Sequence, residues 1–424
     1  MTRDGRIELS QRRAPFTAPG AAVPQALHRY VGRIHDVDSH EQVPTILWAQ
    51  EFGGEDLVAE IVSAYSNSVF ADPKNPSTSH IPDYTGDTME ITPETVWRAK
   101  GARSPGAFDL HRRLDVLDMM GVESSLIFTT SVGLIGAAMR TGLRGGVVKP
   151  RPGLNVDDYT KQLFSAHNDW VIRTQKISPR IRPVAIVQTD DPDSLLASVD
   201  VLIQRGVRAV SFIQSELLGG RSPAHEDLDP VWALLASNDV PATLHLGADG
   251  GLFKTDAWSR APVFEGYKVM AETSVDPWTM STMHLAVQNF LATMVIGGVF
   301  ERHPTLRFGV LECTAHWVGP LSQQLDMWHQ NGYVNQRGKK NSLLPERPSD
   351  YIRRNVRVSA FDFEPIDDYM RRFGLSEVYC FSSDYPHVEG GYEPMLRFAE
   401  RLAPLGEEVM ERFFVTNGEL LLPA

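Results

Sequence analysis

The feature that most constrains the fold is a regular alternation of short apolar segments and helical segments along most of the chain. Eight apolar segments have the length and composition of strands, and helical patterns follow them. The predicted strands are residues 34–40, 124–130, 181–188, 209–214, 242–247, 307–313, 356–361 and 378–383. Such alternation implies parallel strands covered by helices, and eight units favour a closed (β/α)8 TIM barrel over an open sheet.

The helical segments have apolar residues at intervals of three and four positions. They are predicted at residues 108–120, 157–177, 192–206, 229–238, 280–300, 316–330 and 365–373, with two more before the end of the chain. Residues 280–300 are expected to form one long helix, which would suit a subunit contact in a homo- or hetero-oligomer.

Two intervals, 41–107 and 248–276, are too long for ordinary connections. Both follow predicted strands and therefore lie on the C-terminal face of the barrel, where active sites of this fold are found. We expect residues 41–107 to form an inserted lid or subdomain. Residues 1–26 are expected to be a flexible arm, and residues 27–424 a single barrel domain.

Net charge, motifs and apolar segments argue against several classes of protein. The formal net charge of -12 argues against nucleic acid or an anionic membrane as the main partner. No glycine-rich nucleotide-binding motif follows the first strand. The polar N-terminus lacks a signal-peptide pattern, and no apolar run of about 18 residues predicts a membrane span. The two cysteines, Cys313 and Cys380, are expected to be reduced core thiols, and the protein to be cytoplasmic.

Side chains that can bind a metal stand at the ends of four predicted strands. They are Asp38 and His40, then His245, then Glu312 with His316 four residues later, and finally Asp384 with His387. In a barrel these strand ends converge on one mouth. Burying carboxylates and imidazoles together there would be costly without a cation, so a divalent metal site is expected.

Three segments resemble motifs of the amidohydrolase superfamily, in the branch that contains aminocarboxymuconate semialdehyde decarboxylase and the resorcylate decarboxylases. They are Val37-Asp38-Ser39-His40, Gly297 to Pro304, and Phe381 to His387. The resemblance extends over most of residues 34–400. It implies four metal ligands: Asp38, His40, His245 and Asp384.

The sequence departs from this family at the first and sixth strands. Asp38 stands where many members have histidine, and Glu312 stands where many carry a catalytic histidine. Either His316 or Glu312 could then act as proton-transfer partner of Asp384, or Glu312 and His316 could hold a second metal ion. The end of strand four has Gln214 and no lysine, so a carbamylated-lysine bridge is unavailable.

The oxygen-rich ligand set suits Mn²⁺ or Fe²⁺ at least as well as Zn²⁺, with one or two ions per subunit. His387 and Trp317 are expected to contact a small-molecule substrate. The leading hypothesis is a metal-dependent enzyme that hydrolyses or non-oxidatively decarboxylates a small carboxylate or amide. The alternatives are a dinuclear Mn/Fe oxygenase that hydroxylates a small carboxylic or amino acid, and a non-catalytic partner subunit.

Overall fold

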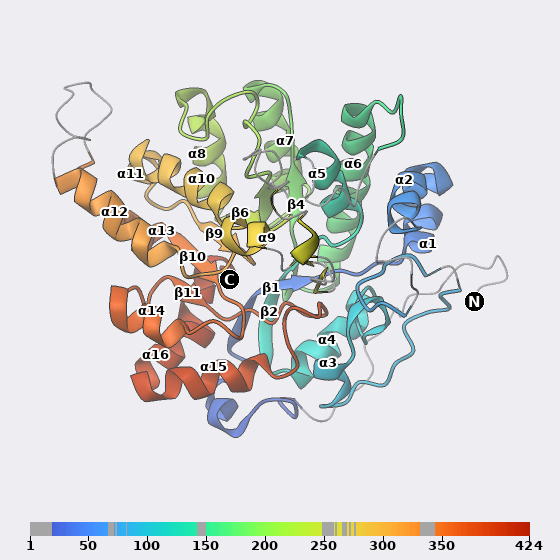
Figure 1. Ribbon diagram of the computed structural model, residues 1–424, viewed down its shortest axis with the longest axis horizontal. Coiled ribbons are helices and arrows are strands. Elements are labelled where there is room, and N and C mark those ends of the chain that lie inside the picture. The colour runs from blue at the N-terminus through green and yellow to red at the C-terminus, as the bar shows by residue number, and fades with distance from the viewer. Residues whose placement is uncertain are drawn as a thin grey trace.

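The computed structural model describes residues 19–66, 72, 74–81, 83–141, 150–247, 258, 261–264, 269–270, 273–274, 277–330 and 344–424. Central strands are surrounded by helices (Figure 1). Among the described residues, no helix is both long enough and apolar enough to cross a membrane.

The strands form two parallel sheets that together contain the eight predicted strand positions. The first sheet has the order β1 (Ile34–His40), β2 (Val122–Phe128), β3 (Ile181–Pro183). The second sheet has the order β11 (Tyr379–Cys380), β10 (Val356–Ser359), β9 (Phe308–Leu311), β6 (Ala242–His245), β5 (Val210–Phe212), β4 (Ala185–Val187). All pairings in both sheets are parallel, as the strand–helix alternation predicts.

Backbone hydrogen bonds join the two sheets at both edges. β3 and β4 are separated only by Val184, whose N–H donates to the carbonyl of Ile127 at 2.9 Å. At the other edge the N–H of Val37 in β1 donates to the carbonyl of Phe381, just after β11, at 3.1 Å. The strands therefore form a closed ring, and the predicted (β/α)8 barrel is confirmed.

A cluster of buried apolar side chains links the barrel strands to the C-terminal end of the chain. Val37, Leu126 and Leu311 belong to it, together with Leu421 and Leu422. Gly309 in β9 leaves room for this packing, because a Cβ atom there would lie 3.0 Å from Leu421 Cδ1. Both cysteines are buried and free, as predicted.

The outer helices agree with most of the predicted positions. They are α4 (Leu110–Met119), α6 (Val156–Thr174), α7 (Pro192–Gln204), α8 (Asp229–Ser237), α12 (Val318–Gln330), α14 (Ile366–Phe373), α15 (Pro394–Leu402) and α16 (Glu407–Glu411). Two further helices, α5 (Val132–Thr141) and α13 (Pro348–Asn355), were not predicted.

The prediction of one continuous helix over residues 280–300 is wrong. This stretch contains the end of α9 (Pro277–Thr282), then α10 (Leu285–Ile296), and the start of α11 (Val299–Arg302). The helix is broken twice, at residues 283–284 and at residues 297–298. At the second break Gly298 has a φ of 72°, in the left-handed region that ends a helix. The apolar spacing continues through both breaks, so periodicity alone could not reveal them.

The described part of the interval 41–107 lies against the barrel mouth. It contains α1 (Thr45–Trp48), α2 (Gly54–Ser66) and α3 (Thr95–Arg98). Its two ends meet where the Gln42 N–H donates to the carbonyl of Ala107 at 2.9 Å. The Gly101 N–H donates to the carbonyl of Pro386 at 2.8 Å, which ties the interval to the loop after β11. That it acts as a lid or subdomain stays a prediction.

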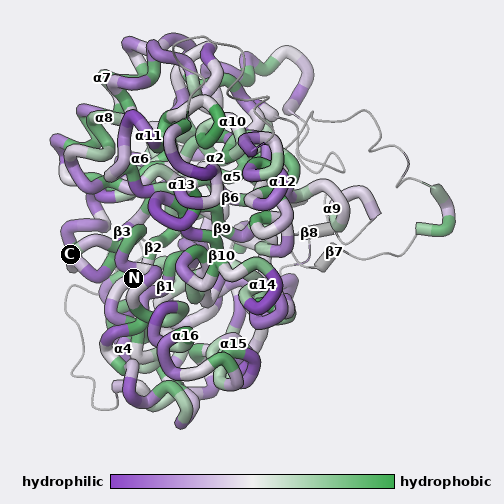
Figure 2. The backbone as a smooth tube through the Cα atoms, turned by 90° about the vertical axis from the view of Figure 1, so that its left-hand side faces the viewer, coloured by the Kyte–Doolittle hydropathy of each residue, from purple (hydrophilic) through white to green (hydrophobic). Residues whose placement is uncertain are grey.

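The other two predicted irregular regions are described only in part. The interval 248–276 includes the antiparallel pair β7 (Val269–Met270) and β8 (Thr273–Ser274), which lies on the opposite side of the body from the C-terminus (Figure 2). At the N-terminus, the N–H of Gly20 donates to the carbonyl of Asp118 at 2.7 Å. Residues 1–18 lie outside the described residues, so the flexible arm stays a prediction.

A buried carboxyl group supports the loop after β9 and gives a pH-dependent prediction. Glu364 accepts hydrogen bonds from the backbone N–H groups of Ala315 and Phe361, both at 2.9 Å. Burial raises the pKa of Glu364 to about 7. A carboxyl group whose pKa is raised in the folded state stabilises the fold at low pH, and this contribution is lost as the pH rises through the folded pKa.

Wild-type protein is therefore expected to lose stability between pH 5 and pH 8 relative to the variant Glu364→Gln. The difference between their free energies of unfolding should change by about 3 kcal/mol across this range. Urea unfolding at several pH values measures it. Parallel pH curves for the two proteins would contradict the assignment.

Candidate metal centre

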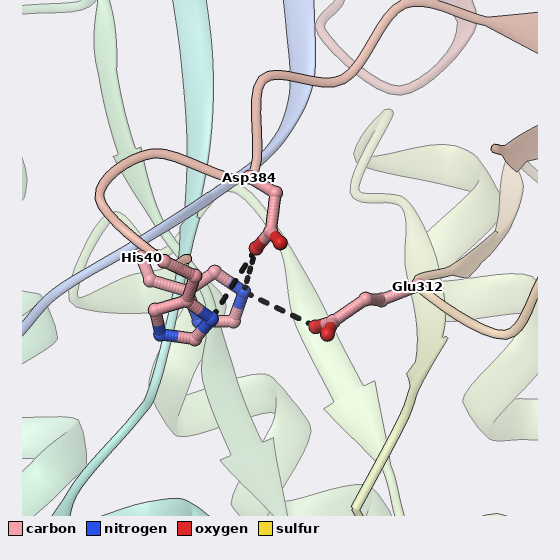
Figure 3. A group of neighbouring side chains, drawn as sticks. His40, Glu312 and Asp384 are labelled. Carbon is pink, nitrogen blue, oxygen red and sulfur yellow. Dashed lines mark ion pairs between the residues drawn. The ribbon is translucent and has the colours of Figure 1, made fainter. Parts of the chain in front are cut away.

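Two overlapping groups of buried side chains at the barrel mouth could hold a metal ion. One contains Asp38, His40 and His245, and the other contains His40, Glu312, Asp384 and His387. In each group, one potential ligand atom per residue lies within 4.8 Å of the others. His40 belongs to both groups, so they form one continuous centre. Figure 3 shows His40 with Glu312 and Asp384 directed toward it.

The imidazole nitrogens lie close to carboxylate oxygens throughout this centre. His40 Nε2 is 3.4 Å from Asp384 Oδ1, 3.5 Å from Glu312 Oε2 and 3.6 Å from Asp38 Oδ1. His245 Nε2 is 3.2 Å from Asp38 Oδ1 and 3.3 Å from Glu312 Oε2. Two ligand atoms about 2.1 Å from one ion, at tetrahedral or octahedral angles, lie about 3.0–3.5 Å apart. Four of the five observed separations fall in that range, and the fifth exceeds it by 0.1 Å.

Local backbone geometry directs these side chains into the mouth. Asp38 and His40 lie two positions apart in β1, so their side chains leave the same face of the strand. Glu312 directly follows β9 with a φ of 54°, and Asp384 lies in the loop after β11 with a φ of 52°. Non-glycine residues rarely adopt such angles, and functional sites are where they concentrate.

Neighbouring groups lie at one ring nitrogen of each of three histidines. His245 Nδ1 donates to the carbonyl of Leu246 at 3.1 Å, so a neutral His245 presents the lone pair of Nε2 to Asp38 and Glu312. The Thr130 hydroxyl lies 3.2 Å from His40 Nδ1 and 2.7 Å from His387 Nε2. A lone pair that faces carboxylates is favourable only if a proton or a metal ion lies between them.

Burial and mutual charge shift the pKa values of the side chains in the centre. Burial, followed by the charge of Asp38, raises the pKa of Asp384 well above its ordinary value. Burial and the neighbouring imidazoles lower the pKa of His40, and burial lowers that of His387 to about 4. Burial alone would lower the pKa of His245, but the charge of Asp38 raises it overall.

Three buried atoms of the centre make no hydrogen bond within the part of the chain that the structure describes. They are His40 Nε2 and both carboxylate oxygens of Asp384. Buried polar atoms normally have partners, and a divalent cation would supply one for all three. The residues present therefore fit a metal ion.

Five of the six predicted metal ligands lie together: Asp38, His40, His245, Glu312 and Asp384. The structure does not place His316 with them. Its Nδ1 lies 2.9 Å from the hydroxyl of Thr314, and its ring contacts that of His284 with a centroid distance of 4.6 Å. Trp317, predicted to contact substrate, is buried, and its indole N–H donates to the carbonyls of Cys313 and Thr314.

His387, predicted as a substrate contact and not as one of the metal ligands, lies within the centre. Its Nδ1 lies 3.3 Å from Asp384 Oδ1, and its ring stacks on His40 with a centroid distance of 3.7 Å. The available signal was Asp384 itself, because aspartate is favoured at the first position of a β-turn, which brings positions i and i+3 together. The His387 N–H donates to the carbonyl of Asp384 at 2.8 Å.

Comparison with known proteins gives the family. A family model described as Amidohydrolase matches residues 153–423, which is more than half of the chain. The protein belongs to the amidohydrolase family, as its motifs indicated. No curated protein matches the sequence.

Solved structures share the fold at low sequence identity. An amidohydrolase from Mycobacterium avium subsp. paratuberculosis K-10 has a TM-score of 0.63 and 20% identity, with 92% of this chain and 98% of that chain covered. A 5-carboxyvanillate decarboxylase from Novosphingobium aromaticivorans DSM 12444, with bound manganese and 3-methoxy-4-hydroxy-5-nitrobenzoic acid, has a TM-score of 0.59 and 15% identity, with coverage of 97% and 100%. A 2,6-dihydroxybenzoate decarboxylase from Rhizobium has a TM-score of 0.53 and 14% identity, with coverage of 92% and 98%.

Proposed function

We propose that this protein is a metal-dependent enzyme that removes the carboxyl group of a small carboxylic acid without oxidation. The observation that carries the proposal is the buried centre in which His40 Nε2 and both Asp384 carboxylate oxygens lack hydrogen-bond partners among the described residues. The decarboxylases that share the fold support this reaction. Amide hydrolysis is the second candidate, because the matched family is described as Amidohydrolase. Neither comparison supports the oxygenase alternative.

The donor set favours one Mn²⁺ ion per subunit. Asp38, Glu312 and Asp384 supply carboxylate oxygens, and His40 and His245 supply imidazole nitrogens. Oxygen-rich sets of this kind suit Mn²⁺ better than a tetrahedral zinc site. A single ion is favoured because the two groups of ligands share His40. Manganese bound in a decarboxylase of the same fold supports this choice.

When bound, the ion would supply Lewis-acid stabilisation for the negative charge of the substrate. Four side chains would bind the ion through their carboxylate oxygens and imidazole nitrogens: Asp38, His40, His245 and Glu312. Asp384 lies at the centre beside His387, where its carboxyl group is placed to deliver a proton. As the bond to the carboxyl group breaks, its electron pair stays on the substrate carbon, which takes the proton from Asp384 while carbon dioxide leaves. His387 beside Asp384 Oδ1 orients that carboxyl group.

The test is to incubate the Mn²⁺-loaded enzyme with 5-carboxyvanillate, hydroxybenzoates and a matched set of aryl amides. Decarboxylation releases carbon dioxide and, in D₂O, places one deuterium on the carbon that loses the carboxyl group. Release of an amine from the amides without carbon dioxide would replace this reaction by hydrolysis. The oligomeric state and the cytoplasmic location stay predictions.

His387 and His316 form a matched pair for testing which histidine serves the centre. His387→Ala should weaken Mn²⁺ binding or activity by about 10- to 100-fold, because it removes a side chain that orients Asp384. His316→Ala should change both by less than about twofold, since His316 lies against His284 outside the two ligand groups. Calorimetric Mn²⁺ titration and initial rates measure this. A larger loss in His316→Ala would instead support a second metal site.

A further inference from the structure

An apolar pocket opens beside His245 at the ends of the neighbouring strands. Phe128, Leu134 and Ile213 belong to its lining, and Gln214 and His245 also face it. The Phe128 ring stacks on His245 with a centroid distance of 4.5 Å. No lysine, arginine, aspartate or glutamate is among the described lining residues. A charged group placed there would be desolvated without a counter-charge, so the pocket favours an uncharged group.

Gln214, two positions beyond β5, is one of four polar residues in this lining, with Thr129, Ser211 and His245. Its side chain is only 6% exposed. Neither its amide nitrogen nor its amide oxygen has a hydrogen-bond partner among the described residues. Leaving a buried carboxamide without partners costs about 1–3 kcal/mol per group. Because the Gln214 amide makes no hydrogen bond to the described residues, it is available to bind a ligand.

A second glutamine, at the adjacent strand end, does form a hydrogen bond within the protein. Gln188 follows β4, and its amide nitrogen donates to Glu216 Oε2 at 2.9 Å. Gln188 does not line the pocket. The two glutamines therefore have similar positions in the barrel but different surroundings, which makes Gln188 a matched control.

The wall of the pocket is closely fitted. Gly247 has a φ of 103°, and a Cβ atom there would lie 2.3 Å from Leu134 Cδ1. A Cβ atom on Gly133 in α5 would lie 2.5 Å from Ile186 Cδ1. These two glycines let α5 and the loop after β6 approach the strand ends. The pocket therefore has a defined shape beside the metal centre.

We infer that Gln214 determines specificity by forming hydrogen bonds with a neutral hydroxyl or amide group on the apolar part of the substrate. This inference rests on the proposed function, in which the carboxylate of the same substrate lies at the metal centre. A carboxamide offers both a donor and an acceptor, so it matches a group that also has both. The substrate class is therefore a carboxylic acid whose apolar body carries a neutral hydrogen-bonding substituent.

The test compares the binding of benzoate, 3-hydroxybenzoate, 4-hydroxybenzoate and isophthalate to the Mn²⁺-loaded protein by calorimetry. Wild type should bind at least one hydroxybenzoate about 10-fold or more tightly than benzoate, because only the hydroxyl gives the buried amide a hydrogen-bond partner. Isophthalate, with its second charge, should bind more weakly than benzoate. Gln214→Leu should abolish the preference and keep the benzoate affinity within about twofold, and Gln188→Leu should keep the preference.

The unfolding temperatures of the variants distinguish a role of Gln214 in substrate recognition from a structural role. Gln214→Leu, with Gln214→Met as the second variant, should unfold at the same temperature as wild type or higher, whereas Gln188→Leu should unfold at a lower temperature. The inference is overturned if both Gln214 variants keep the preference, or if they lose benzoate and hydroxybenzoate binding equally. It is also overturned if Mn²⁺ binds but no probe does, which leaves the metal centre standing. Failure to bind Mn²⁺ overturns the proposed function itself.

Discussion

Asp384→Asn is expected to lower activity by about 1,000-fold or more and to weaken Mn²⁺ binding by at least about 100-fold. Asparagine has nearly the same shape, so it should keep the loop after β11. It removes the negative charge that binds the cation and the acidic proton that Asp384 would deliver. Initial rates on whichever tested acid the wild type decarboxylates, together with Mn²⁺ titration, measure both losses. Full activity in this variant would exclude Asp384 as ligand and as acid.

Asp239→Asn is the matched control for this substitution. Asp239 also has a positive φ, 54°, but it pairs with Arg307 on the surface at 2.9 Å. We expect normal activity and Mn²⁺ affinity in this control. If both variants lost activity, the loss would report a disturbed backbone and not the chemistry of the centre.

Asp384→Asn should also show a pH-dependent change in the stability of the metal-free protein. The pKa of Asp384 is raised in the folded state, so its contribution to stability is full at low pH and is lost as the pH rises through the folded pKa. Above neutral pH, metal-free Asp384→Asn should therefore be at least as stable as metal-free wild type. This would show that Asp384 is kept for binding and chemistry at a cost in stability.

The closed barrel and most of the residues of the candidate metal centre could be predicted because both follow from the strand pattern. Alternation along β1 places Asp38 and His40 on one face, whatever the rest of the chain does. Parallel strands in a ring then bring His245 and Asp384 to the same mouth, although they are far apart in the sequence. These predictions needed only strand positions and topology.

The errors arose where the backbone departs from a regular path. His316 was placed one helical turn after Glu312, but Glu312 and Thr314 both have left-handed φ angles near 54° and 55°. These turns direct His316 toward His284 and away from the centre. The pocket around Gln214 is built from four strands, β2, β4, β5 and β6, and from α5, so no single segment of sequence contains a signal for it.

Removing the metal ion is expected to abolish activity and to lower the melting temperature. An ion present at about 1,000 times its dissociation constant stabilises the folded state by about 4 kcal/mol. For a chain of 424 residues this corresponds to about 4–5 °C in melting temperature. Dialysis against a chelator followed by calorimetric scanning, with and without added Mn²⁺, measures the difference.

Two variants and a series of metals make this experiment decisive. Asp384→Asn should show almost no Mn²⁺-dependent change in melting temperature, whereas Gln214→Leu should keep the full change, because Gln214 lies in the neighbouring pocket and outside both ligand groups. Mn²⁺ should restore more activity than Zn²⁺, since three of the five proposed ligands are carboxylates. A chelated protein that keeps its activity and melting temperature would mean that protons alone hold the carboxylates and imidazoles together. The raised pKa of Asp384 would then describe the working state of the centre, and the chemistry would have to proceed without a metal.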